Sequence, residues 1–453
     1  MVYIPNTDDD RRRMLEKIGV KSFDDLLQPV PKNLQLKKGL DLPEPISELE
    51  LLREMKELSK QNRSDVAVFA GGGVYDHFIP AAVESLISRP EFMTAYTPYQ
   101  AEVAQGTLQV IYEFQTGICR LTGMDVANAS MYDGASAAAE AIGLAMSATN
   151  RTKAVVSDTV SPIYREVVKT YLSGRDVEVI TVPNRGGLSD FDRIKDEIDE
   201  NTAALVVSYP NFFGMLEDIE AAGELIHKVG GKLVVALDPV SAAILKTPGD
   251  LGADIVIGEG QPLGIPMNFG GPLLGFFAIK KDLVRMLPGR LAGRTVDADG
   301  KSGFVLTLQT REQHIRREKA SSNICTNQAL CATAATIYMA LMGKQGLKRV
   351  ALLCLEKTHR TAAEIFALDG YEPLYRGDFV REFAVKTPIP AKDLIDKMIS
   401  EKGILPGINL GRSYPDLTHG LLITVTEKRT DDDIRALVEG LKEYSANKIA
   451  SHV

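Results

Sequence analysis

The chain has 453 residues, of which 45% are hydrophobic, and a formal net charge of -8 at pH 7. A chain of this length exceeds one compact core, so two or three structural units are expected. The acidic balance argues against a general affinity for nucleic acid or for anionic membranes. The first residues lack the apolar run of a signal peptide, and no segment has the length and apolarity of a membrane span. Together with scattered cysteines, these features predict a cytoplasmic protein.

The first 60 residues predict an arm rather than a domain. They are rich in Leu, Glu and Lys and carry prolines at 29, 31, 43 and 45. Such a segment is expected to pack on a neighbour rather than to fold alone. We therefore assign residues 1–60 to a helical arm, 61–330 to a large domain, and 331–453 to a linking helix and a small domain.

From about residue 154, short apolar runs alternate with amphipathic stretches. Continuous apolar runs separated by helices are typical of a parallel sheet that is covered on both faces. This pattern predicts an α/β domain with a doubly wound sheet. The runs are KAVVSD, VEVITV, AALVVSYP, KLVVALDP and ADIVIGE, followed by GGPLLGFFAIKKD as one more strand.

After residue 331 the pattern changes to strand, helix, strand, helix. The stretches EFAVKT and HGLLITVTEKRT predict strands, and AKDLIDKMISEKG and TDDDIRALVEGLKEY predict helices. Thr430, followed by three aspartates, is a plausible N-cap with acids at the positive end of the helix. The sequence thus predicts a small α+β domain at the carboxyl end.

Two positions in the large domain have the character of a cofactor site. Gly134 and Ser136 open an Ala-rich helix whose free N–H groups can bind a phosphate, although the motif taken alone favours an ordinary helix capped by Asp133 or Ser136. Asp238 ends the KLVVALDP strand, where a carboxylate can pair with a pyridine nitrogen or merely turn the chain before Pro239.

The lysine that would complete such a site is absent. In pyridoxal phosphate enzymes of the aminotransferase-like fold it follows the next strand, and here Gln261 and Pro262 occupy that place. Lys246 lies on the preceding connection, and Lys280 lies at the far end of the following strand. A chain with this fold is therefore not expected to hold the cofactor covalently.

Two further clusters of polar residues are candidates for binding. Tyr96, Tyr99 and Gln100 gather around a proline before an amphipathic helix, where they can orient a small zwitterion or simply pack. A cationic run leads into hydroxyl and amide side chains, and it is either a solvated face or a phosphate or carboxylate site. The run comprises Arg311, His314, Arg316, Arg317 and Lys319, followed by Ser321, Ser322, Asn323 and Thr326. The six histidines and four cysteines (Cys119, Cys325, Cys331 and Cys354) show no metal-ligand spacing, so no metal site is predicted.

Long motifs give the chain a specific resemblance. AYTPYQAEVAQGTLQ, TGMDVANASMYDGASAAAEA, PMNFGGPLLGFFAIKKDLVRMLPGRLAG and QTREQHIRREKASSNICTNQAL are similar to the glycine decarboxylase family, the P-protein of the glycine cleavage system. The resemblance covers nearly the whole chain and is closest to the first subunit of the two-subunit form. It implies the aminotransferase-like fold type I architecture with a small C-terminal α+β domain.

The resemblance also implies a division of labour. The cofactor lysine belongs to the second subunit, in a His-Lys pair that Gln261 and Pro262 replace here. The pair of subunits, expected as a two-plus-two tetramer, decarboxylates glycine and transfers the aminomethyl group to the lipoyl arm of the carrier H protein. This chain is expected to complete a shared site, with pyridoxal phosphate on the partner.

Residue roles follow by analogy with dimeric enzymes of this fold. Tyr96, Tyr99 and Gln100 are expected to line the glycine pocket. The expected contacts to the partner's phosphate are Ser322, Asn323 and Thr326, and the vestigial cofactor site comprises Gly134, Ser136 and Asp238.

Two alternatives remain open at this point. One is a complete pyridoxal phosphate enzyme, such as an aminotransferase or desulfurase, that uses Lys246 or Lys280. The other is a pseudoenzyme that only scaffolds or regulates its partner.

Overall fold

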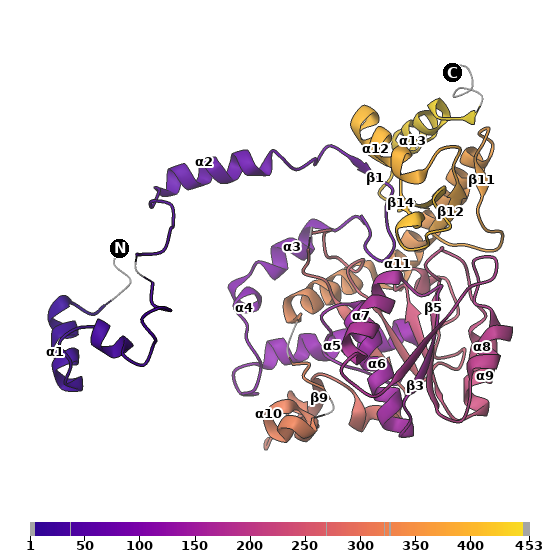
Figure 1. Ribbon diagram of the computed structural model, residues 1–453. Helices are drawn as coiled ribbons and strands as arrows, with labels where there is room; N and C mark the ends of the chain where they lie inside the picture. The colour runs from indigo at the N-terminus through magenta and orange to yellow at the C-terminus, as the bar shows by residue number, and fades with distance from the viewer. Residues whose placement is uncertain (1–4, 37, 269, 321, 326–327, 447–453) are drawn as a thin grey trace. The chain divides into compact units, whose positions relative to one another are not determined.

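The computed structural model describes residues 5–36, 38–268, 270–320, 322–325 and 328–446 (Figure 1). The chain divides into two units between Ser64 and Asp65. The first unit contains helices α1 (Asp8–Ile18) and α2 (Glu48–Ser59), each opened by a capping box. Neither helix has a buried residue among those described. The first unit thus exposes most of its leucines, and neither of its two α-helices contributes a buried residue to a core.

A seven-stranded mixed sheet is the centre of the second unit. Its order is β2-β8-β7-β6-β5-β3-β4, and the five strands from β7 to β4 are parallel. β8 runs antiparallel to both β7 and β2. The strands are β2 (Val126–Ala127), β3 (Lys153–Ser157), β4 (Glu178–Val182), β5 (Thr202–Tyr209), β6 (Lys232–Leu237), β7 (Ile255–Glu259) and β8 (Gly275–Ile279). The predicted parallel sheet is confirmed, and the predicted additional strand is present as antiparallel β8.

Helices cover both faces of this sheet, which explains the continuous apolar runs (Figure 1). Along β5, Leu205 and Val207 pack on one face while Ala204 and Val206 pack on the other. The first face is covered by α5 (Gln105–Thr122), α8 (Phe191–Glu197), α9 (Ile219–Lys228) and the start of α11 (Ala329–Phe366). The second face is covered by α6 (Gly134–Thr149) and α7 (Pro162–Leu172). Every residue of β5 is buried, as a two-sided cover requires.

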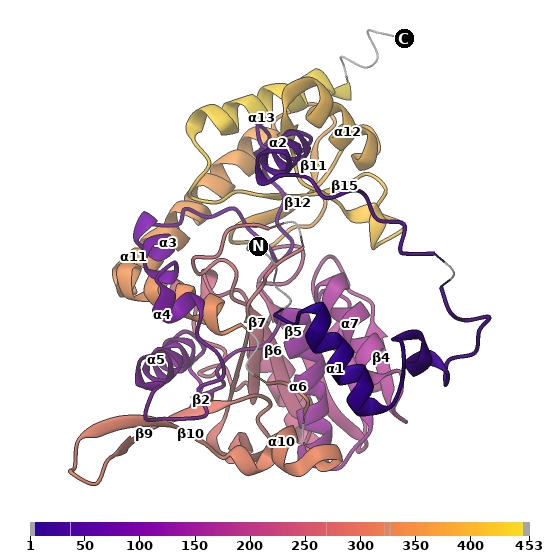
Figure 2. The ribbon, with the colours of Figure 1, turned by 90° about the vertical axis from the view of Figure 1, so that its left-hand side faces the viewer.

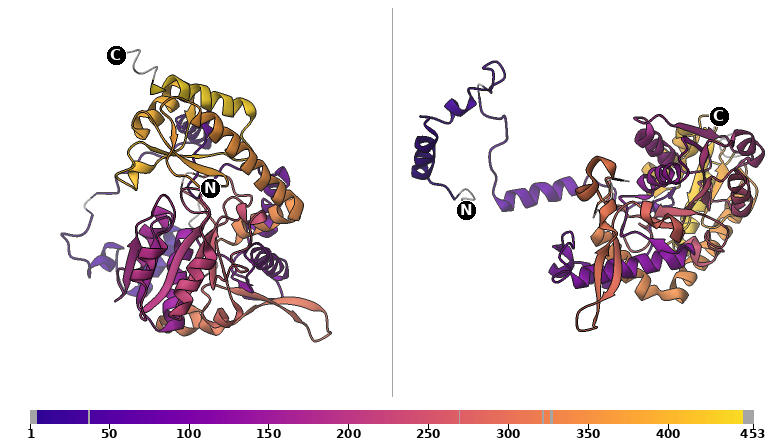
Figure 3. Two further views of the ribbon diagram at one scale, coloured as in Figure 1. Left: turned by 90° about the vertical axis from the view of Figure 1, so that its right-hand side faces the viewer. Right: turned by 90° about the horizontal axis from the view of Figure 1, so that it is seen from below.

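Short helices and a hairpin flank this core. α3 (Ala81–Ile87) and α4 (Pro90–Met93) precede α5. The hairpin of β9 (Leu291–Val296) and β10 (Ser302–Thr307) projects from the second unit, as Figure 2 and the left view of Figure 3 show. α10 (Gln313–Arg316) follows the hairpin. The sequence analysis did not predict this hairpin, which places Arg290 and Glu312 near its base.

A small domain follows α11, which is interrupted at Gly343, where φ is 57°. Its four-stranded antiparallel sheet has the order β11-β12-β15-β14 and packs against α12 (Ala391–Lys402) and α13 (Asp431–Glu443). The strands are β11 (Glu372–Pro373), β12 (Glu382–Lys386), β14 (Ile408–Asn409) and β15 (Gly420–Thr424). β1 (Ala67–Val68) pairs in parallel with β13 (Ile404–Leu405).

The predicted cap of the last helix is confirmed. The Thr430 side chain accepts a hydrogen bond from the backbone N–H of Asp433, and the Asp433 side chain accepts one from the backbone N–H of Thr430. Among the described residues, no helix is both long and apolar enough to cross a membrane.

Candidate active site

The start of α6 is the first element of the predicted vestigial site, and the N–H groups of Gly134 and Ser136 donate to side chains of the chain itself. The Asp133 carboxylate accepts a hydrogen bond from the backbone N–H of Ser136 at 2.7 Å, and the Ser136 hydroxyl donates to the Asp133 carbonyl. The backbone N–H of Gly134 donates to the carboxylate of Glu259 at 3.1 Å. Asp133 is thus the cap, and a second carboxylate lies where a phosphate would bind.

Glu259 ends β7 and is buried below the start of α6. It also accepts hydrogen bonds from the backbone N–H groups of Gln261 and Leu274, both at 2.9 Å. Burial raises the pKa of Glu259 to about 7, although the three backbone N–H groups act in the opposite direction. Tyr164 closes the space from the side, because a Cβ added to Gly134 would lie 1.8 Å from the Tyr164 hydroxyl. Side chains of this chain therefore lie at the helix start where the sequence predicted a phosphate.

Asp238, the second element, is paired with a cation from the small domain. Nη2 of Arg381 donates to its carboxylate at 2.6 Å, and the side chains of Arg381 and Asp238 are 3% and 12% exposed. Ser241 also donates to Asp238 through its backbone N–H and its hydroxyl. Burial alone would lower the pKa of Arg381, but Asp238 and neighbouring groups raise it overall. The carboxylate that could face a pyridine nitrogen is thus neutralised within the chain.

The cavity between these groups is small. It is lined by residues that include Gly72, Tyr164, Asp238, Glu259 and Arg381, and its volume is about 70 Å³. Ligand pockets in proteins hold roughly 300–1,000 Å³. Tyr75 is among the lining residues, and the guanidinium carbon of Arg381 lies 3.4 Å from the centre of its ring.

No lysine reaches this cavity from the positions considered above. The amine of Lys246 lies 2.8 Å from Glu220, and both side chains are more than half exposed. Lys280 pairs with Asp254, which immediately precedes β7 and so lies at the opposite end of that strand from Glu259. The side chain of Gln261 donates to the carbonyls of Tyr75 and Ile265 and accepts from the N–H of Tyr75. The residues present do not fit pyridoxal phosphate.

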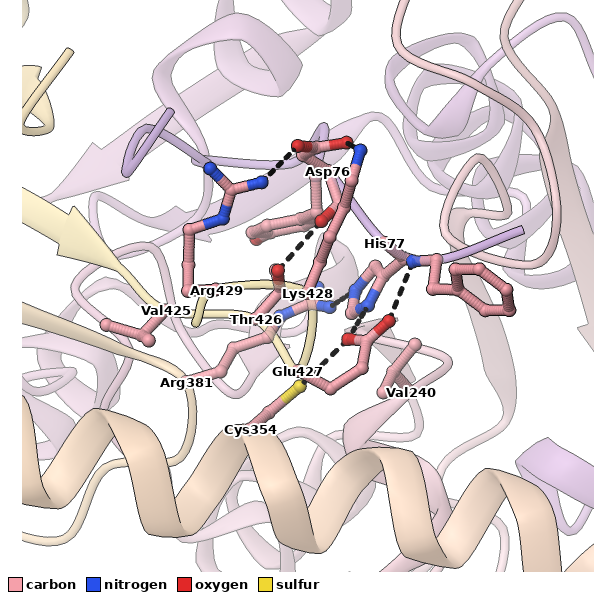
Figure 4. Close-up of polar contacts among 12 residues, drawn as sticks. Asp76, His77, Val240, Cys354, Arg381, Val425, Thr426, Glu427, Lys428 and Arg429 are labelled. Carbon is pink, nitrogen blue, oxygen red and sulfur yellow. Dashed lines mark hydrogen bonds and ion pairs between the residues drawn. The ribbon is translucent and has the colours of Figure 1, made fainter. Parts of the chain in front are cut away.

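A buried cluster beside Arg381 has the residue types of a metal site. Among the residues that the structure describes, His77, Cys354 and Glu427 form the one group whose ligand atoms all lie within 4.8 Å of one another. Figure 4 shows His77 between Arg381 and Glu427, with Nη1 of Arg381 2.8 Å from its Nε2 and Glu427 2.6 Å from its Nδ1.

The hydrogen bonds in this cluster oppose metal binding. A guanidinium only donates, so Nε2 of His77 accepts and Nδ1 carries the proton that points at Glu427. Burial raises the pKa of the Cys354 thiol, which works against the thiolate form that binds metals. The cluster instead connects α11, the end of β15 and the segment before α3 (Figure 4).

The glycine-pocket candidates lie elsewhere, on the segment between α4 and α5. Tyr96 is 89% exposed, Tyr99 is 49% exposed, and Gln100 is also exposed. Tyr99 accepts a hydrogen bond from Nη2 of Arg290 at 2.8 Å, and its ring meets the ring of His314 edge-on at 5.5 Å. Exposed aromatic residues of this kind are typical of a surface that another chain covers.

The phosphate-contact candidates lie on the segment before α11. The Ser322 hydroxyl accepts from the backbone N–H of Ile324 at 3.0 Å and is hydrogen-bonded to Glu140. Asn323 is exposed, whereas Thr326 and Ser321 lie outside the described residues. Cys325 accepts from the same Nη2 of Arg290 at 2.8 Å. Arg290 thus joins Tyr99 to the segment that carries the phosphate-contact candidates.

The cationic run is divided between the interior and the surface. Arg311 is buried and donates to the carbonyl of Leu287, and burial lowers its pKa. His314, Arg316, Arg317 and Lys319 are exposed. The exposed members suit the interpretation as a solvated face, whereas Arg311 contacts a backbone carbonyl in the interior.

Four residues of these sites were missed in the sequence analysis: Glu259, Arg290, Glu312 and Arg381. Glu259 ends an apolar strand, which makes it resemble an ordinary charged strand end. Arg290 is a single charge that precedes the apolar Leu291, whereas Glu312 lies between Arg311 and Gln313 and gives no such signal. A charged residue inside an otherwise apolar stretch was the available signal, because a buried charge needs a partner.

Comparisons with known proteins show the family and the fold of the chain. The family described as glycine cleavage system P-protein matches residues 1–441. A probable glycine dehydrogenase (decarboxylating) subunit 1 from Carboxydothermus hydrogenoformans is 52% identical over 443 residues, which cover 97% of this chain and 99% of the relative. A crystal structure of glycine decarboxylase (P-protein) of the glycine cleavage system, in inhibitor-bound form, has a TM-score of 0.89 at 43% identity, covering 98% of this chain and 100% of that one.

A more distant likeness concerns the fold alone. A cysteine desulfurase from Escherichia coli has a TM-score of 0.62 at 14% identity and covers 88% of this chain and 99% of its own. The architecture is that of the fold type I pyridoxal phosphate-dependent enzymes. The chain belongs to the glycine cleavage system P-protein family.

Proposed function

We propose that this chain is the half of a two-subunit glycine decarboxylase that does not carry the cofactor. The main support is the occupation of both polar positions of the vestigial site by the chain's own side chains. Glu259 meets the N–H of Gly134, and Arg381 meets Asp238. A chain whose own side chains occupy its cofactor site can still contribute surface residues that line a site on a partner.

The proposed reaction is that of the family. Glycine loses its carboxyl group as carbon dioxide, and the aminomethyl group passes to the lipoyl arm of the H protein. Pyridoxal phosphate, bound on the partner, supplies the acceptor for the electrons of the breaking C–C bond. The residues of this chain need only bind, orient and exclude water.

The residues proposed for these tasks are the glycine-pocket candidates and the phosphate-contact candidates. Tyr96, Tyr99 and Gln100 would line the glycine pocket, and Ser322, Asn323 and Thr326 would contact the phosphate on the partner. Arg290 supports this grouping, since one guanidinium group contacts both Tyr99 and Cys325. The exposure of Tyr96 and Tyr99 suits a surface that becomes covered on assembly.

The proposed assembly is a two-plus-two tetramer in the cytoplasm. The exposed leucines of α2 in the arm suit packing on a neighbouring chain, and they include Leu49, Leu51, Leu52 and Leu58. All four cysteines are free, which suits a reducing compartment. The three-part division into arm, large domain and small domain is part of this proposal.

Reconstitution tests the proposal. We would measure the release of labelled carbon dioxide from carboxyl-labelled glycine, with H protein present, for this chain alone, for the partner alone and for the two together. Release by the mixture alone is the expected result. Release by this chain alone would reject the proposal and favour a complete pyridoxal phosphate enzyme.

A further inference from the structure

Arg290 connects two segments that are far apart in the sequence. It immediately precedes β9 and is 1% exposed. Its Nη2 donates to the Tyr99 hydroxyl and to the Cys325 sulfur, both at 2.8 Å. One buried guanidinium group therefore fixes the distance between the glycine-pocket candidates and the segment of the phosphate-contact candidates.

Tyr99 needs such a tether. It is 49% exposed on a segment whose neighbour Tyr96 is 89% exposed, so packing alone restrains its side chain weakly. The guanidinium carbon of Arg290 lies 4.5 Å from the centre of the Tyr99 ring. A hydrogen bond from a charged donor and a cation-π contact together restrict the ring to one rotamer.

Glu312 holds Arg290 in turn. Its carboxylate lies 3.3 Å from Nη1 of Arg290, and both side chains are almost completely buried. His314, whose ring meets Tyr99, lies 3.5 Å from the same carboxylate. The arginine is thus fixed by an ion pair on one side and contacts Tyr99 on the other.

The buried Arg290–Glu312 ion pair is not the arrangement that stability alone favours. Nε and Nη1 of Arg290 and Oε1 of Glu312 are buried without a hydrogen-bond partner among the described residues, so Glu312 holds Arg290 by charge alone. Unsatisfied buried groups of this kind are costly, and apolar residues of similar volume would avoid the cost. A buried arginine that retains them has a role beyond packing.

We propose that Arg290 is a positioning residue for the glycine decarboxylase reaction. It holds Tyr99 and the segment that ends at Cys325 at one fixed spacing. Both can therefore contact the partner's site at the same time. The inference rests on the proposed function and adds to it a residue that need not touch glycine or the cofactor. It predicts that Arg290 and Tyr99 act as one unit.

The test uses the full chain with its partner subunit and H protein. Arg290→Lys keeps the charge opposite Glu312 but loses the planar fork, so folding is retained while the tether to Tyr99 is lost. We would compare it with Tyr99→Phe, with the double variant, and with Arg294→Lys on the exposed part of β9 as the matched control. A fluorotyrosine placed at position 99 reports the ring environment in this chain alone by ¹⁹F NMR.

The inference predicts three results. Arg290→Lys lowers kcat/KM by roughly ten- to a hundredfold, the range for a displaced contact group, with assembly intact. The double variant is no worse than the more impaired single variant, because the two residues share one interaction. The ¹⁹F resonance shifts or broadens in Arg290→Lys and not in Arg294→Lys.

Two results would overturn it, and they have different consequences. An unchanged ¹⁹F resonance, or fully additive losses in the double variant, rejects the positioning role while the proposed function stands. A changed resonance with normal turnover in both Arg290→Lys and Tyr99→Phe removes Tyr99 from the glycine pocket, so that part of the proposed function and this inference fail together.

Discussion

The carboxylate of Glu259 accepts a hydrogen bond from the backbone N–H of Gly134 at 3.1 Å. This contact places a side chain of the protein at the positive end of α6, where a helix favours an anion. The Arg381–Asp238 ion pair fills the opposite side of the same cavity. Both positions that could bind a cofactor through charge are therefore satisfied within the chain.

The buried Glu259 carboxylate should make stability depend on pH. Its folded pKa is raised to about 7 from 4.5, so between these values the folded state binds more protons than the unfolded state. The contribution of Glu259 to the free energy of unfolding is complete below about pH 4.5 and is lost as the pH rises through about 7. The full effect is about 3 kcal/mol at most. As the pH rises from 5 to 8, the Tm of the unmodified chain should therefore fall relative to the Tm of Glu259→Gln.

The control for this prediction is Glu178→Gln, which alters an exposed glutamate at the start of β4. Its Tm should follow the Tm of the unmodified chain at every pH. If the plots of Tm against pH for Glu259→Gln and the unmodified chain are parallel, Glu259 is ionised in both the folded and the unfolded state. That result would reject the prediction.

Replacing only one partner of the Arg381–Asp238 ion pair should lower the free energy of unfolding strongly. Asp238→Asn leaves a guanidinium that is 97% buried facing a neutral group, so we expect a loss of about 3 kcal/mol in the free energy of unfolding. Arg381→Met should be similarly costly. The double variant should lose less than the sum, because neither charge then remains unpaired. Urea denaturation measures all three.

A matched pair on the surface serves as the control. Lys392 and Asp396 form an ion pair at 2.9 Å on α12, and both side chains are more than 60% exposed. Asp396→Asn should leave the urea midpoint unchanged, because solvent screens such pairs. An equal effect at both sites, or additive losses at the buried pair, would contradict the account.

Restoring a lysine should not restore covalent cofactor binding. Pro262→Lys supplies an amine at the position that the resemblance assigns, yet Glu259 and Arg381 still occupy the cavity of about 70 Å³. After incubation with pyridoxal phosphate and reduction with borohydride, we expect no stoichiometric label at position 262 by peptide mass. A labelled Lys at that position would show that the missing lysine alone prevents binding.

The exposed candidates should affect turnover without affecting assembly. Tyr99→Phe and Asn323→Ala should each lower kcat/KM by roughly tenfold, as expected when one hydrogen bond to a substrate or cofactor is lost. Analytical ultracentrifugation with the partner checks that the complex still forms. Normal turnover in both variants would instead favour a subunit that acts only as a scaffold.

Much of the fold could be predicted because its signals are local. The apolar runs of β3, β5, β6 and β7 are continuous because each strand is covered on both faces, and the Thr430 cap needs only residues within one turn. The β9–β10 hairpin could not be predicted in the same way. Its strands are half exposed and lack the long apolar run that marked the other strands.

The contacts that define the sites could not be predicted, because they join distant parts of the chain. Asp238 and Arg381 are separated by 143 residues, and Gly134 and Glu259 by 125. Sequence pattern places each residue on its own element but does not show which elements meet. The chain's lack of a lysine at Gln261 and Pro262 was visible in the sequence, whereas the groups that fill the cavity in its place were not.

The most direct test of the central claim locates the cofactor. This chain would be incubated with pyridoxal phosphate alone and then together with the partner subunit, reduced with borohydride, and digested so that phosphopyridoxyl-lysine peptides can be identified by mass. The account predicts label on the partner alone. Stoichiometric label on a single lysine of this chain, in the absence of the partner, would contradict it.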